Sequence, residues 1–396
     1  MQLVFSDQPL PSSVTKSIFL AGPSPRSLDE TDWRQGAIQL LESMGFDGTV
    51  FLPIPSYRFL RNQPDAASWS YENQIDWECR ARKASDVVAF WIPRVIDRSK
   101  EDLGMPGFTT NFEMGEDLHS AKLAYGRPDT AVKCRYLDER AQELGLPVHK
   151  TLDALLSQVV AQLGAGALRT GAETQVPLVV WNTDAFQTWY TNLKAAGNRL
   201  DGATLSSVIV VGKQHLFAFV LHVKVWVESE QRHKENERVF FRKDVSSVVA
   251  VYREGETTHL ALVREFRSTV NNPQGFVYEF AGGSTTQAGV DPQVNAQQEL
   301  HEEMGLLVTD VRRFKPVGNR QLAATFSAHR AQVYAVELTR HEFERLKQAA
   351  ASKKMFGDGA GSERTFIEVA TLDTLFDLPV DYSTLGMLFE ALRVLR

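Results

Sequence analysis

The stretch from Gly282 to Gly305, GGSTTQAGVDPQVNAQQELHEEMG, constrains the fold of this chain more than any other. It begins with a glycine pair and a polar loop. The dipeptide Asp291-Pro292 then has the residue types of a helix N-cap followed by proline at the first helical position. The residues after it predict a helix that ends at Gly305. Here the chain is expected to pass from a tight turn into a capped helix.

This predicted helix carries three acidic residues on one face. Glu299, Glu302 and Glu303 are spaced i, i+3 and i+4, so their carboxylates are neighbours on the helix surface. Like charges at this spacing destabilise an isolated helix by about 0.2–0.5 kcal/mol per pair. A divalent cation would remove this repulsion, and Mg²⁺ prefers oxygen ligands. The alternative is an acidic face that is simply solvated.

The same residues resemble a known signature. Residues 298–306, QELHEEMGL, resemble the end of the Nudix box, R-E-U-x-E-E-x-G-U with U aliphatic, and residues 278–283, YEFAGG, resemble the strand and glycine turn that precede it. The resemblance implies a site for Mg²⁺, or for Mn²⁺ in its place. Its ligands would be three carboxylates and one main-chain carbonyl: Glu299, Glu302, Glu303 and Gly282.

The sequence differs from this signature at three points. The arginine of the family's box is Gln298 here, its earlier glutamate falls on Val290, and the loop after Gly283 is one residue longer. The three metal-site carboxylates are retained. Because the missing residues would orient the loop and helix, the departures bear on turnover more than on metal binding.

Other residues near the box are candidates by the same resemblance. The segment Arg264-Glu265-Phe266-Arg267 resembles a strand of ADP-ribose-type Nudix enzymes that lies close to the substrate. Arg264 and Arg267 would bind a pyrophosphate through their forked donors, with a charged edge strand as the alternative. Glu279 is a further substrate-binding candidate. Glu363 would act as general base or extra ligand, and a plain surface glutamate is its alternative.

Length, charge and cysteine content limit the class of protein. A chain of 396 residues is expected to form two or three domains. The net charge of −6 argues against binding of a nucleic acid polymer. There is no signal-like N-terminus and no apolar run near the ~20 residues that span a membrane. Only Cys79 and Cys134 are present, which fits a reducing cytoplasm.

The N-terminal part has the pattern of a parallel sheet. The apolar runs 17–22, 50–52 and 87–92 alternate with helical patterns, which predicts strands buried on both faces. Residues 131–134 are predicted to form a further short strand.

This part resembles the nucleoside 2-deoxyribosyltransferase family over about residues 15–135. The resemblance is carried by the motifs FLAGP at 19–23, QID at 74–76, SDVV at 85–88, T-x-x-E-x-G at 110–115 and GRP at 126–128. Each motif alone is short, but their order and spacing agree. The family's glycine before the threonine is Thr109 here.

The resemblance assigns roles to four residues. Glu113 would be the nucleophile that attacks the sugar anomeric carbon, Asp76 would hold the sugar or help to move the proton, and Gly22 would let the main chain approach the ligand. Asp86 is a further substrate-binding candidate. Cleavage of an N-glycosidic bond passes through an oxocarbenium-like state that carboxylates stabilise. The alternatives without a functional role are a surface aspartate for Asp76, a first-turn glutamate for Glu113 and a turn residue for Asp86.

The expected fold is α/β with two domains. Residues 1–163 would form a doubly wound parallel sheet, and residues 164–175, which are small and polar, would be a linker. Residues 176–396 would form an α+β Nudix domain, an α/β/α sandwich with a strand-rich lead-in over 176–245 and a core over 246–396. Its first element is predicted to be a strand over 176–181.

Two hypotheses for the function follow. The first is a bifunctional enzyme that hydrolyses a pyrophosphate in a nucleoside diphosphate derivative and cleaves or transfers at the N-glycosidic bond of a nucleoside or nucleotide. The second is a sensor that binds a nucleotide derivative without turnover. The substitution Glu113→Ala would distinguish the two hypotheses. Loss of base release would support the enzyme, and unchanged activity with altered ligand affinity would support the sensor. Both families imply a homodimer.

Overall fold

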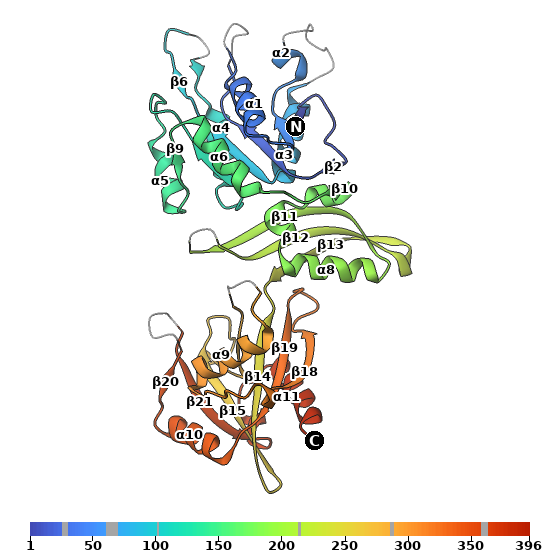
Figure 1. Ribbon diagram of the computed structural model, residues 1–396, viewed down its shortest axis with the longest axis vertical. Helices are drawn as coiled ribbons and strands as arrows, with labels where there is room; N and C mark the ends of the chain where they lie inside the picture. Colours follow the sequence, from blue (N-terminus) through green and yellow to red (C-terminus); the bar gives the residue numbers. More distant parts are fainter. Residues whose placement is uncertain (26–30, 61–69, 101–102, 213–214, 286–288, 358–362) are drawn as a thin grey trace. The chain divides into compact units, whose positions relative to one another are not determined.

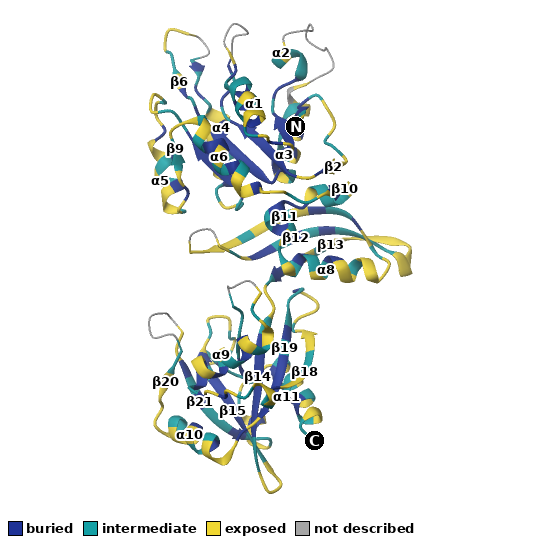
Figure 2. Cartoon of the chain, viewed as in Figure 1, coloured by how far each residue is buried: buried dark blue, intermediate teal, exposed yellow. Residues whose placement is uncertain are grey.

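The computed structural model describes residues 1–396 except 26–30, 61–69, 101–102, 213–214, 286–288 and 358–362. It divides into two compact units, Met1–Arg242 and Lys243–Arg396 (Figure 1). Each unit has a buried sheet with helices packed against it, and burial is concentrated in the central strands (Figure 2).

The first unit contains a six-stranded sheet in which every pair of neighbours is parallel. The apolar strands β3 and β5 are buried along their whole length, as expected for a sheet covered on both faces. In spatial order the strands are β1 (Gln2–Phe5), β4 (Thr49–Leu52), β3 (Ser17–Ala21), β5 (Val87–Trp91), β8 (Leu123–Gly126) and β9 (Val148–His149).

Helices cover both faces of this sheet. Leu41 of α1 (Trp33–Ser43) and Leu155 of α6 (Leu152–Leu163) belong to the core on one face. The other face is covered by α3 (Tyr71–Ala84), α4 (Phe108–Asp117) and α5 (Arg135–Glu143), which contribute Trp77, Met114 and Leu137. The predicted doubly wound parallel sheet is confirmed.

Two local predictions for this unit are wrong. Residues 131–134 do not form a strand, because Lys133 has a φ of 55° and turns the chain into α5. Residues 176–181 do not form a strand either. Pro177 stands at the N-cap of the short helix α7 (Leu178–Trp181), where its fixed φ and missing N–H are tolerated.

The expected linker is part of the first unit. It contains β10 (Arg169–Thr170), which pairs with β2 (Ser13–Val14), and the 3₁₀ helix η1 (Gly171–Gln175). Arg169 is fully buried, and its two terminal nitrogens each lie 2.7 Å from an oxygen of the Asp86 carboxylate. Asp86 also accepts a 2.7 Å hydrogen bond from the main-chain nitrogen of Leu178.

The expected lead-in also belongs to the first unit. Its strands β11 (Arg199–Val211), β12 (His215–Val227) and β13 (Arg232–Arg242) form an antiparallel sheet. Phe186 of α8 (Asp184–Ala195) packs against Phe241 of β13. The main-chain nitrogen of Ala203 donates to the Gln175 side chain at 3.0 Å. The unit boundary therefore falls after Arg242, because these strands pack with residues 164–195.

Smaller elements complete the first unit. They are α2 (Ser56–Leu60), β6 (Val95–Ile96), β7 (Gly104–Met105) and η2 (Glu228–Glu230).

The second unit contains a mixed sheet. β14 pairs in parallel with β19, and the other pairs are antiparallel. Its strands are β14 (Val245–Glu254), β15 (Thr257–Phe266), β16 (Phe276–Glu279), β17 (Ala281–Gly283), β18 (Lys315–Gln321), β19 (Arg330–Glu337), β20 (Met355–Phe356) and β21 (Thr365–Thr371).

Helices cover both faces of the second sheet as well. Leu300 of α9 (Pro292–Met304) and Phe343 of α10 (Arg340–Ala351) belong to the core on one face. Leu388 of α11 (Tyr382–Val394) belongs to the core on the other face. Short 3₁₀ turns lie at η3 (Val311–Arg313) and η4 (Thr374–Asp377). This arrangement is the helix–sheet–helix sandwich expected for the C-terminal part.

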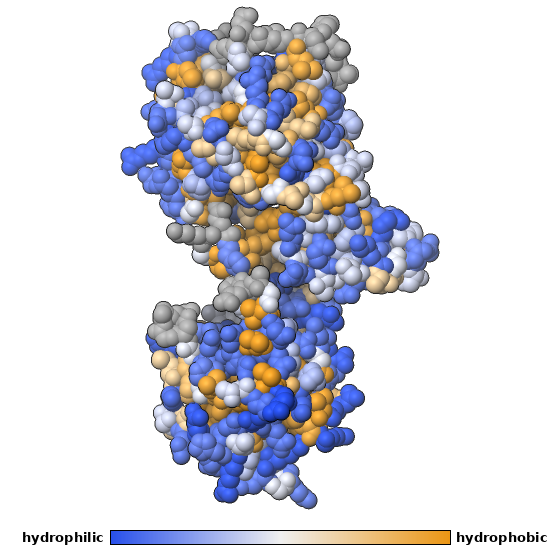
Figure 3. Space-filling view, in the orientation of Figure 1, coloured by the Kyte–Doolittle hydropathy of each residue, from blue (hydrophilic) through white to orange (hydrophobic). Residues whose placement is uncertain are grey.

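The surface is mostly polar on the face seen in Figure 3, with apolar residues in small groups. Among the described residues, no helix combines the length and the apolar character needed to cross a membrane.

Candidate functional site

A cavity of about 450 Å³ lies at the carboxyl ends of the central strands of the first unit. Gly22 follows β3 and Ile54 lies just beyond β4, and both line it. From β3 the chain winds first to β4 on one side and then to β5 on the other. Such switch points leave a crevice at the carboxyl ends of strands, where ligands bind in open α/β sheets.

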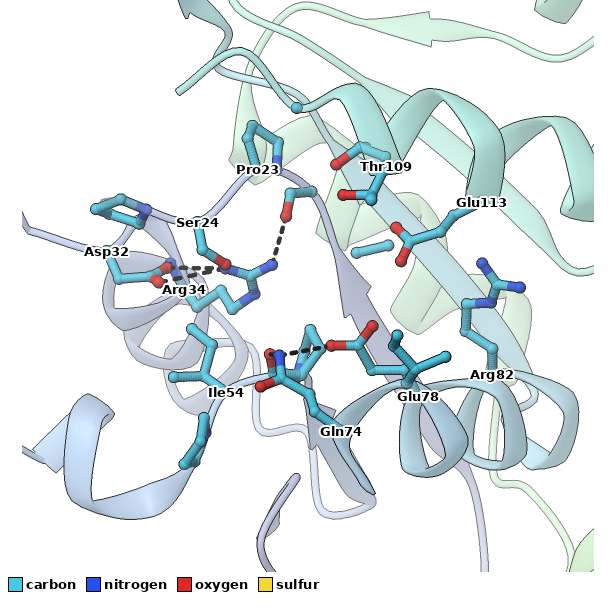
Figure 4. Close-up of a pocket in the computed structure, with 18 of the residues that line it drawn as sticks. Pro23, Ser24, Asp32, Arg34, Ile54, Gln74, Glu78, Arg82, Thr109 and Glu113 are labelled. Atoms are coloured by element: carbon cyan, nitrogen blue, oxygen red, sulfur yellow. Dashed lines mark hydrogen bonds and ion pairs between the residues drawn. The ribbon is translucent and has the colours of Figure 1, made fainter. Parts of the chain in front are cut away.

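Helix α3 provides one wall of the cavity. Ser70 caps it by accepting a hydrogen bond from the main-chain nitrogen of Asn73 at 3.2 Å. Gln74, Glu78 and Arg82 follow at intervals of four residues and face the cavity together (Figure 4).

The role expected for Asp76 is not supported by its position. Asp76 lies half a turn away from Gln74 and Glu78, is exposed, and pairs with Arg80 at 2.8 Å on the outer face of α3. It does not line the cavity. Glu78 is the carboxylate of this helix that does.

Helix α4 provides the facing wall and carries Glu113. The helix begins at Phe108 after Gly107, which has a φ of 60° and serves as N-cap. Glu113 is therefore beyond the first turn, so a dipole-favoured first-turn glutamate does not describe it. Its carboxylate is directed into the cavity, on the side opposite Glu78 (Figure 4).

The two carboxyl groups differ in the influences that shift their pKa values. Burial raises the pKa of Glu78 to about 7, and the negative charge of Glu113 adds to the rise. Burial also raises the pKa of Glu113, but the positive charges of Arg82 and Arg34 are the next largest influences and oppose it. Glu78 is therefore the better proton donor near neutral pH, and Glu113 is more readily ionised.

Arg34 and Gly22 hold the floor of the cavity. Arg34 is fully buried and donates to the main-chain oxygens of Leu20 and Gly22 at 2.9 and 2.7 Å. Gly22 has a φ of 150°, and a Cβ there would lie 2.1 Å from the main-chain oxygen of Trp91. Glycine is required by this neighbouring strand, and the expected approach to a ligand remains a prediction.

Asp86 is not in the cavity, contrary to its expected role in substrate binding. It precedes β5, so it lies at the amino end of the sheet, whereas the cavity is at the carboxyl end. Its side chain is fully buried and bonded to Ser17, Arg169 and Leu178. The residue joins segments of the first unit.

A second candidate site lies in the second unit, where four glutamates from three segments meet. Asp291 caps α9 by accepting from the main-chain nitrogen of Gln293 at 2.7 Å, and Gly305 ends the helix with a φ of 65°. Glu299 and Glu303 lie on this helix. Ligand oxygens of Glu303, of Glu265 on β15 and of Glu363 before β21 lie within 4.8 Å of one another.

Burial raises the pKa of acidic residues in this cluster, and repulsion among them adds to the rise. Burial raises the pKa of Glu299 to about 7, with added repulsion from Glu302 and Glu363. Burial raises the pKa of Glu303 well above its ordinary value, although it accepts a 2.9 Å hydrogen bond from the main-chain nitrogen of Gly282. Glu302 is exposed, and it is not among the three carboxylates that converge.

The glycine pair lets the helix approach the sheet. A Cβ on Gly283 would lie 2.5 Å from Glu299 Oε1, and one on Gly282 would lie 2.6 Å from the main-chain oxygen of Ser246. The amide of Gly282 contacts Glu303, so the predicted ligand residue does lie beside the carboxylates.

Arg267 and Glu279 also belong to this region. Arg267 lies 3.1 Å from Glu279 Oε1 and 2.8 Å from Glu265 Oε2. The second contact lacks hydrogen-bond geometry, since this buried oxygen has no hydrogen-bond partner among the described residues.

Arg264 faces away from the cluster, which differs from its expected role. Residues alternate between the faces of a strand, so Arg264 lies on the face opposite Glu265 and Arg267. There its guanidinium packs over the rings of Phe276 and Phe366, at 4.6 and 5.1 Å from their centroids.

The donor set of the cluster fits a hard divalent cation. Its ligand atoms are carboxylate oxygens, which Mg²⁺ and Mn²⁺ accept. Arg267 pairs with both Glu265 and Glu279. These two ion pairs therefore contribute one positive charge for two carboxylates. A bound cation would relieve the repulsion among these carboxylates, which adds to the effect of burial in raising their pKa values.

Two carboxylates of these sites, Glu78 and Glu265, were not predicted from the sequence, and neither were Arg34 and Arg82. Glu78 lies four residues after Gln74 and therefore on the same face of the helix, but helical spacing alone does not show which face lines the cavity. Glu265 belongs to the segment 264–267, in which the family resemblance points to the arginines. Only the strand pairing of β15 with β21 brings Glu265 close to Glu363.

Comparison with known proteins supports the N-terminal resemblance. A family model described as "Nucleoside 2-deoxyribosyltransferase like" matches residues 15–125. This range contains Gly22, Glu78 and Glu113, and it covers the strands β3, β4 and β5 and most of β8 of the parallel sheet. The N-terminal region is thus similar to that family in sequence and has the cavity at its switch point.

The other comparisons are less informative. No curated protein matches the chain. Among 155 matching chains of solved structures is one titled "Crystal structure of ADP compounds hydrolase", with 16% identity, a TM-score of 0.32, and coverage of 49% of this chain and 95% of its own. A TM-score this low does not establish a shared fold.

Proposed function

We propose that the first unit cleaves the N-glycosidic bond of a nucleoside or nucleotide and passes the sugar to water or to another base. The observation that carries this proposal is the pair Glu78 and Glu113, which face one cavity and whose pKa values are shifted by different neighbours. A pair of carboxyl groups with separated pKa values is the arrangement that glycosidic cleavage needs.

The reaction uses the two carboxyl groups in turn. The Glu113 carboxylate attacks the anomeric carbon as the bond to the base breaks, and the Glu78 proton passes to the leaving base. A covalent glycosyl ester on Glu113 results. Glu78, now ionised, accepts a proton from the incoming water or base, which attacks the same carbon and frees Glu113. The positive charges of Arg82 and Arg34 favour the ionised form of Glu113 and oppose the effect of its burial.

Product analysis of single variants tests this proposal. The pure protein would be incubated with a panel of nucleosides and nucleoside monophosphates, and free base would be measured by mass spectrometry. We expect base release from the wild-type protein and a loss of at least about a hundredfold in Glu113→Gln and in Glu78→Gln.

Asp76→Asn is the matched control, because it changes a carboxylate of α3 outside the cavity. It should keep wild-type activity. Base release that survives Glu113→Gln but disappears in Asp76→Asn would contradict the proposed site.

We further propose that the second unit is a metal-dependent hydrolase of a pyrophosphate in a nucleoside diphosphate derivative. The carboxylate cluster supports this proposal. Mg²⁺ or Mn²⁺ would be held by Glu299, Glu302, Glu303 and the Gly282 carbonyl, with Glu265 and Glu363 beside them. The bound ion would polarise the phosphates and lower the pKa of bound water.

The chain's own residues have separate tasks in this reaction. Arg267 would bind a phosphate oxygen once a bound cation compensates Glu265 and Glu279. Glu363, the most exposed of the three converging carboxylates, would accept the proton of the attacking water. The Gly282 amide fixes the carboxylate of Glu303 through its 2.9 Å hydrogen bond.

A substrate panel with Mg²⁺ tests the second activity. ADP-ribose, NAD and dinucleotides would be supplied, and monophosphate release would be measured. Release should disappear in Glu303→Gln and persist in Glu113→Gln, because the two residues belong to different units. If compounds bind to both units and none is consumed, the chain is a sensor of nucleotide derivatives.

A further inference from the structure

Gln74 forms a hydrogen-bonded bridge between the end of a strand and Glu78. Its side-chain nitrogen Nε2 donates to Glu78 Oε1 at 2.9 Å and to the main-chain oxygen of Pro53 at 3.2 Å. Pro53 directly follows β4, and Gln74 precedes Glu78 by one turn of α3. The bridge therefore joins two elements that line the same cavity (Figure 4).

These two contacts determine how the amide of Gln74 is turned. Nε2 has two hydrogens, and each has an oxygen acceptor. The opposite orientation would place the amide oxygen against the main-chain oxygen of Pro53, which can only accept, whatever the protonation state of Glu78. The donor side of Gln74 is thus held toward Glu78 without dependence on a ligand.

The bridge also selects the oxygen of Glu78 that holds a proton. Oε1 already accepts from Gln74, so in the neutral acid the proton resides on Oε2. Figure 4 shows this second oxygen turned away from Gln74, on the side of Glu113 and the cavity. A proton on Oε2 can pass to a group inside the cavity.

We propose that Gln74 is a positioning residue, which orients Glu78 so that its transferable proton points into the cavity. The meaning of this orientation for catalysis rests on the proposed glycosidic activity. The orientation itself, and its effect on the proton of Glu78, do not require turnover.

Gln74 also opposes the other influences on Glu78. The charged groups that act on Glu78 are Glu113 on α4, Arg34 on α1 and Arg82 on α3. Burial raises the pKa of Glu78, and the hydrogen bond from Gln74 is the largest influence that lowers it. Loss of this donor is therefore expected to raise the pKa further, because the carboxylate loses its stabilising N–H.

The test uses Gln74→Met, which keeps the length of the side chain and its helix propensity but has no donor. Asn73→Met is the matched control, since it makes a similar change at the preceding, exposed residue of the same helix. The first readout is the titration of ¹³C-labelled glutamate carboxyls by NMR, with Glu78→Gln used to assign the Glu78 signal. The second readout is the pH profile of base release.

In Gln74→Met we expect the titration midpoint of Glu78 to rise by about one pH unit, which corresponds to one charge-assisted hydrogen bond. The alkaline limb of kcat should move by the same amount. At the plateau, kcat should fall about tenfold with little change in KM, because the proton is no longer directed at the leaving base. Asn73→Met should match the wild-type protein in both readouts.

Each other outcome decides between the claims. An unchanged midpoint in Gln74→Met overturns the inference, whatever the activity. A raised midpoint with an unchanged plateau kcat means that Gln74 tunes the acid without orienting it, which also overturns the positioning role. If the wild-type protein releases no base, the proposed function fails, and the NMR midpoint alone shows whether Gln74 holds Glu78.

Discussion

At the scale of single residues, Glu78 and Glu113 are the same type of side chain in one cavity, but different neighbours act on their pKa values. Both are buried in one cavity, and burial favours the neutral form of each. Glu113 has Arg82 and Arg34 as the leading opposing influences, whereas at Glu78 these charges rank behind the repulsion from Glu113. In the proposed reaction, these different surroundings would distinguish the acid from the nucleophile.

A pH profile is the first prediction at this scale. Glu78 must be protonated to act as an acid, and its pKa is raised to about 7, so kcat/KM for base release should fall as the pH rises through about 7. Glu113 must be ionised, so activity should also fall at acidic pH. In Glu78→Gln the alkaline limb should disappear together with most of the rate. A wild-type profile that stays flat to pH 9 or so would exclude Glu78 as the acid.

The buried pair of Asp86 and Arg169 gives a second prediction. Both side chains are fully buried, so Asp86→Ala leaves the guanidinium of Arg169 without its carboxylate. We expect the free energy of unfolding of the first unit to fall by about 3–5 kcal/mol, measured by denaturant titration. Asp76→Ala removes the exposed partner of Arg80 and should cost less than about 1 kcal/mol. Equal effects of the two changes would argue against this structural role.

At the scale of elements, α9 is built to bring carboxylates against a sheet. The Asp291 cap, the proline at the first position and the terminal Gly305 define its length. Because Gly283 has no side chain, the helix approaches so closely that the Glu299 carboxylate lies where a side chain of residue 283 would be. The price of this packing is charge repulsion, which is relieved by protons or by a cation.

Helix α9 should therefore couple stability to pH and to metal. The pKa of Glu299 is raised to about 7, so the folded protein binds this proton more tightly than the unfolded chain. Stability of the second unit should fall as the pH rises from about 4.5 toward about 7 and then level off. Mg²⁺ at a hundredfold excess over its dissociation constant should add about 2.7 kcal/mol, and more of that gain should be seen at about pH 8 than at about pH 5.5.

Scanning calorimetry of the full chain with and without Mg²⁺ would measure this coupling. The matched control is Glu299→Gln with Glu303→Gln, in which both the pH dependence and the gain with Mg²⁺ should be lost. A gain that is as large in this control as in the wild-type protein would place the bound cation elsewhere.

At the scale of the whole molecule, the unit boundary after Arg242 leads to a prediction about fragments. A fragment ending at residue 163 lacks Arg169, Val176 and Leu178, which are buried in the first unit. We expect this fragment to be unfolded, and fragments 1–242 and 243–396 to fold alone. Far-UV circular dichroism and the cooperativity of unfolding would measure this. Cooperative unfolding of the fragment 1–163 would contradict the boundary.

The two units can be observed separately in the intact chain. Every tryptophan lies at or before Trp226, so tryptophan fluorescence follows only the first unit. Because the units have separate cores, its transition is expected to differ from the one followed by circular dichroism.

The sequence by itself determined the elements whose signals are local. The buried strands β3, β4 and β5, the caps of α9 and the glycine turn before it follow from residue types at fixed short spacing. The same holds for the placement of Glu113 on a helix, of Glu299 and Glu303 on one helix face, and for the parallel sheet of the first unit.

Only the tertiary structure decided what depends on distant contacts. Asp76 and Glu78 are two residues apart, and which of them faces the cavity depends on how α3 lies on the sheet. Asp86 lies outside the cavity because it precedes β5, at the opposite end of the strand. Arg169, which belongs to the segment expected to be a linker, is buried and pairs with it. Glu265 joined Glu363 through strand pairing. Burial and long-range pairing have no short-range signature, so these outcomes could not be taken from local patterns.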